Sequence, residues 1–70
     1  MMPLTMVRAG ETNAIKRITG KDDTKQFLAS LGFVEGAQVT VISQLSGNMI
    51  LNIKETRVAL DQAMAQRIMV

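Results

Sequence analysis

The sequence predicts a mainly β fold, a small barrel of about five to six short strands with one helix (about 22–31) and a short helical turn (about 61–66). Short apolar segments alternate with tight turns along most of the chain, as in small barrels. Residues 22–31 carry the clearest helical spacing of apolar side chains. The 70 residues allow one small domain, which we expect to span 1–70.

The composition excludes several kinds of function. The chain is 47% hydrophobic with a formal net charge of +2, which favours a folded domain over a disordered segment. It contains no Cys and no His, so disulfides, thiol nucleophiles, zinc fingers and imidazole catalysis are excluded. The serines and carboxylates form no catalytic motif. We therefore expect no enzyme and assign no catalytic or cofactor-binding residue, and any metal ligands stay unknown.

The same sequence favours a cytoplasmic protein with no direct membrane insertion. Apolar runs such as residues 49–51 are far shorter than the roughly 18 residues of a membrane span. The N-terminal residues lack the charged start and long apolar run of a signal peptide.

The basic residues favour a solvated surface over a nucleic-acid footprint. The net charge is small, and only 3% of the residues are aromatic, with no Tyr or Trp to stack on bases. Acidic residues 22 and 23 interrupt the densest basic cluster, which consists of Lys16, Arg17, Lys21 and Lys25. We expect no nucleic-acid partner.

The N-terminal part should begin with an apolar lead-in at residues 4–7, which could pack or pair. Residues 12–18 then read as an imperfect strand, because Ile15 and Ile18 are three apart and strict alternation places them on opposite faces. Either a bulge near Lys16 and Arg17 brings both into the core, or one isoleucine faces out.

The helix at residues 22–31 has a start signal and a stop signal. Asp22 or Asp23 can accept hydrogen bonds from the free amides of the first turn. Gly32 stands where a left-handed residue closes a helix, and Phe33 can fold back as the apolar partner of that cap. We expect the helix to bury one stripe, made of Phe27, Leu28 and Leu31. Residues 34–36 form a second tight turn.

Residues 38–44 and 48–54 predict a hairpin whose register follows from its apolar faces. Opposed residues in an antiparallel pair lie on the same side of the sheet. The apolar residues of both strands should therefore lie on one side of the sheet. This requirement excludes a two-residue loop at residues 46–47 and favours a three-residue loop at 45–47, with Gly47 beside a bulge. The expected inner pairs are Val39 with Ile53, Val41 with Leu51, and Ser43 with Met49. The expected outer pairs are Thr40 with Asn52, Ile42 with Ile50, and Gln44 with Asn48.

This register places Ile42 and Ile50 side by side on the outer face. A helix or the N-terminal segment could cover them, which is the interpretation we favour, or they could form a contact surface for another chain. An exposed apolar pair on a short chain is compatible with a homodimer but does not demand one.

The C-terminal part completes the barrel. A turn at residues 54–56 leads to a strand at 57–60, with Val58 and Leu60 on one face. Asp61 can cap a short helix that carries Met64, and residues 68–70 form a last apolar strand.

Taken together, these segments resemble the FeoA family. Residues 27–39 (FLASLGFVEGAQV) resemble its signature of a hydrophobic pair, Leu-Gly-hydrophobic and a turn glycine. The closing pattern of the family resembles residues 47–54, 57–60 and 65–70, and its usual start resembles Leu4 with Gly10-Glu11. Two turn positions depart from the family, because Glu35 and Asn48-Met49 stand where proline is common.

The resemblance implies an SH3-like barrel and a cytosolic accessory protein of bacterial ferrous-iron transport. Its implied partner is the cytosolic GTP-binding region of the membrane iron transporter. Related domains are found at the C-terminus of iron-dependent repressors. The alternative function is therefore a metal-binding regulatory module with Fe²⁺ or another divalent cation as ligand. The candidate partner-contact residues are Ile42, Ile50, Glu35 and Gly36.

Overall fold

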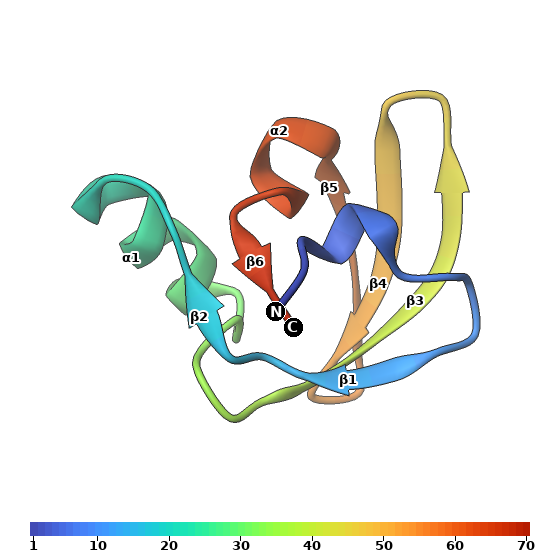
Figure 1. Cartoon of the computed structure of the whole chain (residues 1–70), viewed down its shortest axis with the longest axis horizontal. Helices are drawn as coiled ribbons and strands as arrows, with labels where there is room; N and C mark the ends of the chain where they lie inside the picture. The colour runs from blue at the N-terminus through green and yellow to red at the C-terminus, as the bar shows by residue number, and fades with distance from the viewer.

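A computed structural model describes residues 1–70 and contains six strands and two α-helices (Figure 1). The fold is mainly β, which confirms the predicted class. The elements in chain order are a 3-10 helix η1 (Leu4–Met6), β1 (Thr12–Ala14), β2 (Arg17–Ile18), α1 (Asp22–Ser30), β3 (Gln38–Leu45), β4 (Asn48–Ile53), β5 (Thr56–Asp61), α2 (Gln62–Ala65) and β6 (Ile68–Met69).

The strands form two antiparallel sheets. One has the order β1-β3-β4-β5, and the other pairs β2 with β6. The N-terminal lead-in lies on the free side of β6, where Met2 and Val70 exchange backbone hydrogen bonds of 2.9 and 2.8 Å and Pro3 bridges to Met69. The two ends of the chain therefore lie next to each other, as Figure 1 shows.

The expected strand at residues 12–18 is divided between the two sheets. The Ile15 N–H donates to the Ala37 carbonyl at 2.9 Å, and the next N–H, that of Lys16, donates to the Met69 carbonyl at 2.8 Å. Ile15 is buried and Ile18 is half-buried against the core. The change of sheet at residues 15–16 thus directs both isoleucines inward, as the bulge interpretation required.

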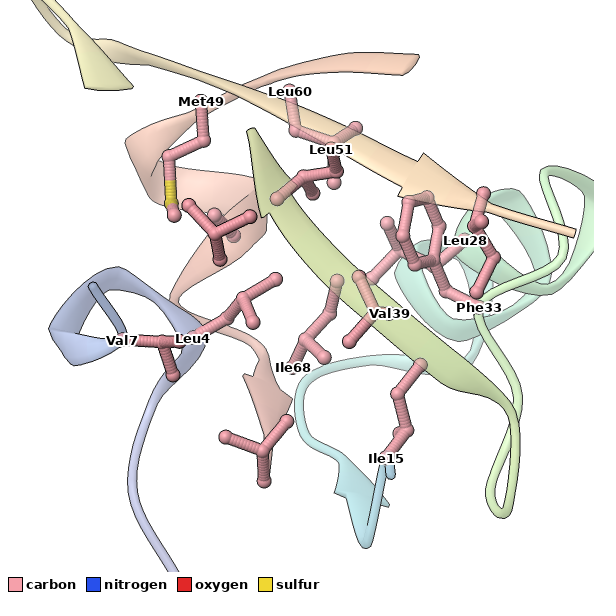
Figure 2. Packing of buried hydrophobic residues seen from close by; sticks show 14 residues of the cluster. Leu4, Val7, Ile15, Leu28, Phe33, Val39, Met49, Leu51, Leu60 and Ile68 are labelled. Carbon is pink, nitrogen blue, oxygen red and sulfur yellow. The ribbon is translucent and has the colours of Figure 1, made fainter. Parts of the chain in front are cut away.

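Helix α1 ends as the sequence predicts. The Phe33 N–H donates to the Leu28 carbonyl at 3.0 Å, and the Gly32 N–H donates to the Ala29 carbonyl at 2.9 Å. Gly32 has a φ of 105°. This pair of bonds is a Schellman motif, and it folds the fully buried Phe33 ring back beside Leu28 (Figure 2).

The start of α1 confirms that Asp23 accepts an amide of the first turn, although neither aspartate is the N-cap residue. The N-cap residue is Lys21, which contributes no side-chain bond. Asp22 and Asp23 instead lie in the first turn, where Asp23 Oδ1 accepts the Thr24 N–H at 2.8 Å. Both carboxylates keep a favourable position at the positive end of the helix dipole.

The predicted apolar stripe of α1 was wrong at Phe27, which is 48% exposed. The face turned toward the core consists of Thr24, Leu28 and Leu31, which follow the spacing i, i+4, i+7. Only Leu28 is fully buried, because α1 is short and lies at the edge of the barrel. Phe27 projects to the side of that stripe.

The β3–β4 register is correct for half of the hairpin and wrong for the other half. Val39, Thr40 and Val41 pair with Ile53, Asn52 and Leu51 as predicted. A bulge at Ile42 then shifts the register, so that the remaining pairs become Ser43 with Ile50, Gln44 with Met49 and Leu45 with Asn48. The loop consequently has two residues, Ser46 and Gly47, and not three.

The bulge places Gln44 opposite Met49, on the inner side of β3, where it stays exposed beside the η1 segment. Its Nε2 donates to the Val7 carbonyl at 3.1 Å and lies 3.5 Å from the Thr5 carbonyl. The alternation of apolar residues in β3 does not predict these hydrogen bonds, because their acceptors lie in and next to the distant η1 segment. Because the bulge adds one residue to β3, a two-residue loop becomes compatible with an apolar inner face.

The C-terminal elements follow the prediction closely. Residues Lys54 and Glu55 form the β4–β5 turn, and Leu60 is buried on the inner face of β5. Asp61 caps α2, with Oδ1 accepting the Met64 N–H at 2.8 Å. Chain segment β6 then pairs with β2.

One core unites both sheets, η1 and the two helices. It contains 14 buried residues, all of them hydrophobic. Figure 2 shows Val39, Leu51 and Ile68 lying between the sheets, with Leu4 and Val7 entering from the N-terminal segment. None of the helices is long and apolar enough to cross a membrane.

Candidate interaction surface

The structure has no pocket, and its acidic residues do not gather into groups of three or more that could hold a metal ion. No polar or charged residue is buried. On the outer surface, seven large hydrophobic residues stay exposed.

Ile42 and Ile50 lie on the outer face of the four-stranded sheet, although they are not the directly opposed pair that the sequence predicts. The bulge places both Ile42 and Ser43 opposite Ile50. Ile50 is half-buried, and it alternates with buried Met49 and Leu51, so its side chain points outward. Ile42 is 37% exposed, so the interpretation that a helix or the N-terminal segment covers the pair is wrong at this residue.

Two further residues extend this apolar area. Leu45 is 63% exposed and pairs with Asn48, on the same face as Ile50. Ala59 of β5 is exposed and lies directly opposite Ile50. We call the four residues Ile42, Leu45, Ile50 and Ala59 the sheet patch. Sequence reasoning missed Leu45 because it assigned that residue to the loop, and the bulge that brings it into β3 has no apolar signature.

Polar residues lie beside the sheet patch on the same face. Toward the start of β3, the Thr12 and Thr40 hydroxyls are hydrogen-bonded at 2.7 Å. Asn52 pairs with Thr40 on one side and with Arg57 on the other, which continues this polar row across the sheet. An apolar centre with polar groups at its margin is the usual anatomy of a protein-contact surface.

The turn at Glu35 and Gly36 forms a separate feature. Both residues are exposed, and the Gly36 N–H donates to the Ile15 carbonyl at 2.8 Å. The Ala37 N–H closes the turn on the Val34 carbonyl at 3.1 Å. The first half of β3 separates this turn from Ile42 by roughly 13 Å of strand, so the structure does not bring the predicted contact residues together.

A second exposed apolar feature lies near the end of α1. Phe27 is 48% exposed, and Val34, in the following turn, is 38% exposed. Sequence reasoning missed Phe27 as a surface residue because it lies one residue from the fully buried Leu28. Its position serves below as a control for the sheet patch.

Sequence comparison places the chain among proteins of iron transport. The FeoA domain profile matches residues 2–70. A relative from Methanocaldococcus jannaschii that carries the name Fe(2+) transport protein A is 31% identical over 70 residues, which is 100% of this chain and 85% of the relative.

Solved structures agree with this assignment. An iron uptake regulatory protein, FeoA, superposes with a TM-score of 0.91 at 29% identity, over 99% of this chain and 92% of its own. The zinc-complexed FeoA of Stenotrophomonas maltophilia, described as an SH3 domain protein, shares the fold with a TM-score of 0.87 at 22% identity, over 100% and 89% of the two chains.

A manganese-dependent transcriptional repressor contains a similar unit. It superposes with a TM-score of 0.87 at 25% identity, over 94% of this chain but only 38% of the repressor. The resemblance in the sequence, the profile over residues 2–70 and the SH3-like barrel agree, and this chain belongs to the FeoA family, whose members are accessory proteins of Fe²⁺ transport.

Proposed function

We propose that this chain is a non-enzymatic accessory module that acts in the cytoplasm and binds the cytosolic GTP-binding region of the ferrous-iron transporter. Membership of the FeoA family supports the transport role. The observation that carries the binding role is the exposed apolar patch on the outer sheet face of a chain with no pocket.

The sheet patch is the proposed contact surface for the transporter. Its centre is Ile50, which is flanked by Ile42, Leu45 and Ala59, and a polar row lies beside it. Burying aliphatic side chains of this kind contributes about 25 cal/mol for each Å² removed from water. Leu45, the most exposed of the three large side chains in the patch, should be the strongest single contact.

A binding measurement between the purified chain and the transporter's cytosolic region tests this proposal. Leu45→Ser should weaken binding about tenfold or more, since truncating a strong contact residue commonly costs that much. Phe27→Ser is the matched control, because it removes a similarly exposed apolar group far from the sheet patch. Isothermal titration calorimetry should be run without nucleotide, with GDP and with a non-hydrolysable GTP analogue.

The turn at Glu35 and Gly36 forms a second arm of the same experiment. Glu35→Lys reverses an exposed charge without touching the sheet patch and should leave the affinity within about twofold. A loss confined to Phe27→Ser or Glu35→Lys would move the contact surface to the other end of the barrel. No binding in any nucleotide state would contradict the transporter as partner.

Likeness to the manganese-dependent repressor supports a second candidate function, a metal-binding regulatory module. Such a site would use oxygen ligands, because the chain has neither Cys nor His. Titrating ¹⁵N-labelled protein with Mn²⁺ or Fe²⁺ distinguishes the two functions. Saturable changes confined to a few carboxylate-bearing residues would favour the metal-binding function, and unmoved amide signals would remove it.

A further inference from the structure

Strand β5 forms the longest sheet edge that has no neighbouring strand. The four-stranded sheet ends at β1 on one side and at β5 on the other. β1 has three residues, whereas β5, Thr56–Asp61, has six. Four of the six are exposed, and Val58 is half-buried.

The turn geometry shows which backbone groups of β5 face that open edge. Ile53 and Thr56 flank a two-residue turn, so they form a hydrogen-bonded pair, and bonded pairs then alternate along the ladder. Arg57, Ala59 and Asp61 consequently direct their N–H and C=O groups away from β4. No backbone hydrogen bond outside the ladders involves Arg57 or Ala59.

Strand β5 lacks most of the features that usually protect an open edge, although it carries the charged residues Arg57 and Asp61. Natural edges are blocked by proline, lysine, inward-pointing charges or bulges. β5 contains neither Pro nor Lys, and its inward residues, Val58 and Leu60, are apolar. Its register with β4 runs unbroken from Asn48 opposite Asp61 to Ile53 opposite Thr56. The edge is therefore unbroken and has no strand partner.

We propose that β5 pairs with β5 of a second copy of this chain, antiparallel and centred on Ala59. A two-fold axis through Ala59 places Ala59 opposite Ala59, where the two residues can exchange both N–H···O=C bonds. The same register places Arg57 opposite Asp61 of the second copy, and Asp61 opposite its Arg57. The dimer then contains one continuous sheet of eight strands.

Charge complementarity selects a second copy as the occupant of this edge. Arg57, Ala59 and Asp61 lie on one face of β5, and their order, positive, small and negative, becomes self-complementary when the strand is reversed. Asp61 Oδ1 already accepts the Met64 N–H at 2.8 Å, which leaves Oδ2 for the arginine of the second copy. On the inner face, the register brings half-buried Val58 toward Leu60 of the other chain.

Sedimentation velocity measures the association directly. An edge-strand interface is small for a specific interface and therefore weak. The measurement accordingly covers protein concentrations from about 10 µM to about 1 mM. We expect a concentration-dependent monomer–dimer equilibrium. Arg57→Glu should raise the dimer Kd about tenfold or more, because the two-fold axis places the reversed charge opposite Asp61 at two equivalent positions of the interface. Arg17→Glu on β2 is the matched control, with the same change of charge on another exposed arginine, and should leave the Kd within about twofold.

Disulfide trapping tests the register without altering charge. The chain has no cysteine, so Ala59→Cys introduces one thiol at the proposed axis. Opposed residues of a bonded pair have Cα atoms about 5.5 Å apart, within the range that a disulfide spans. Ala59→Cys should cross-link rapidly under mild oxidation. Ala14→Cys, on an exposed alanine of the other edge strand, is the control and should cross-link slowly.

The outcomes separate this proposal from its alternatives. A chain that stays monomeric at about 1 mM, a dimer equally weakened by Arg17→Glu, or faster trapping through Ala14→Cys would each overturn the β5 interface. Heteronuclear spectra of each variant verify that it is folded. These experiments need no transporter, so their result is independent of the proposed transport function.

Discussion

At the scale of single residues, the β4–β5 turn carries the clearest local strain. Lys54 and Glu55 have positive φ angles of 49° and 64°, and they are the only residues other than glycine in that region. Two consecutive residues in this conformation are typical of a type I′ turn, which favours Asn-Gly. Ordinary side chains in this region cost about 1–2 kcal/mol each.

Replacing these two residues with the preferred pair should stabilise the barrel. We expect Lys54→Asn with Glu55→Gly to raise the free energy of unfolding by about 1 kcal/mol. Urea denaturation monitored by circular dichroism measures the change.

The control for this turn is Glu35→Gly, the same exchange at an exposed residue that does not have a positive φ. There the glycine only increases the freedom of the unfolded chain, and stability should fall by up to about 1 kcal/mol. If both exchanges shift the urea midpoint in the same direction, strain at residues 54 and 55 is not the cause.

At the scale of elements, the end of α1 depends on Gly32. A Cβ at Gly32 would lie 3.4 Å from Ile53 Cγ1, at the short limit of van der Waals contact with a fully buried side chain. Gly36 also has a positive φ, 87°, but a Cβ there would meet nothing within 4 Å. The two glycines therefore separate backbone strain from packing.

Gly32→Ala should destabilise the protein more than Gly36→Ala does. We expect about 1 kcal/mol for Gly36→Ala from strain alone, and about 2 kcal/mol for Gly32→Ala, because the contact with Ile53 adds to it. Thermal unfolding of the two variants under identical conditions provides the comparison. Equal losses would show that Ile53 adjusts without cost.

The elements also show where sequence reasoning succeeds. The Schellman end of α1 and the Asp61 cap follow from residues close together in the chain, and the first three β3–β4 pairs follow from the alternation of apolar residues. The bulge at Ile42 and the exposed position of Phe27 do not. The bulge accommodates Gln44, which binds the carbonyls of the distant η1 segment, and the orientation of α1 depends on what the rest of the barrel leaves open. Long-range contacts of this kind leave no periodic pattern.

The candidate site was predictable to the same degree. Ile42 and Ile50 were located on the correct face because strand alternation alone determines it. Leu45 was missed because its place in β3 depends on the bulge. The open edge of β5 could not be read from sequence, since it requires the strand order of the sheet.

At the scale of the whole molecule, the small core limits stability. A chain of this size has about 4–10 kcal/mol of unfolding free energy in total. Leu51 is fully buried between the sheets, whereas Leu45 is 63% exposed. Leu51→Ala should cost about 2–5 kcal/mol, and Leu45→Ala less than about 0.5 kcal/mol.

Hydrogen exchange on the two leucine variants provides the measurement. Leu51→Ala should accelerate exchange of the β3, β4 and β5 amides together, since they share one core. Leu45→Ala should leave the protection pattern of the parent protein. Acceleration restricted to β4 in the first variant would mean that the sheet does not unfold as a unit.

The bonds between Met2 and Val70 impose an order on the maturation of the barrel. The segment at Met2 and Pro3 has its partners at positions 69 and 70, so it cannot pair until almost all of residues 1–70 have left the ribosome. Until then, Leu4 and Val7 have no partner from β6, and a nascent chain would expose them to chaperones. Closure of this barrel is thus expected to be a late step that follows formation of the β3–β4–β5 meander, whose strands are neighbours in sequence.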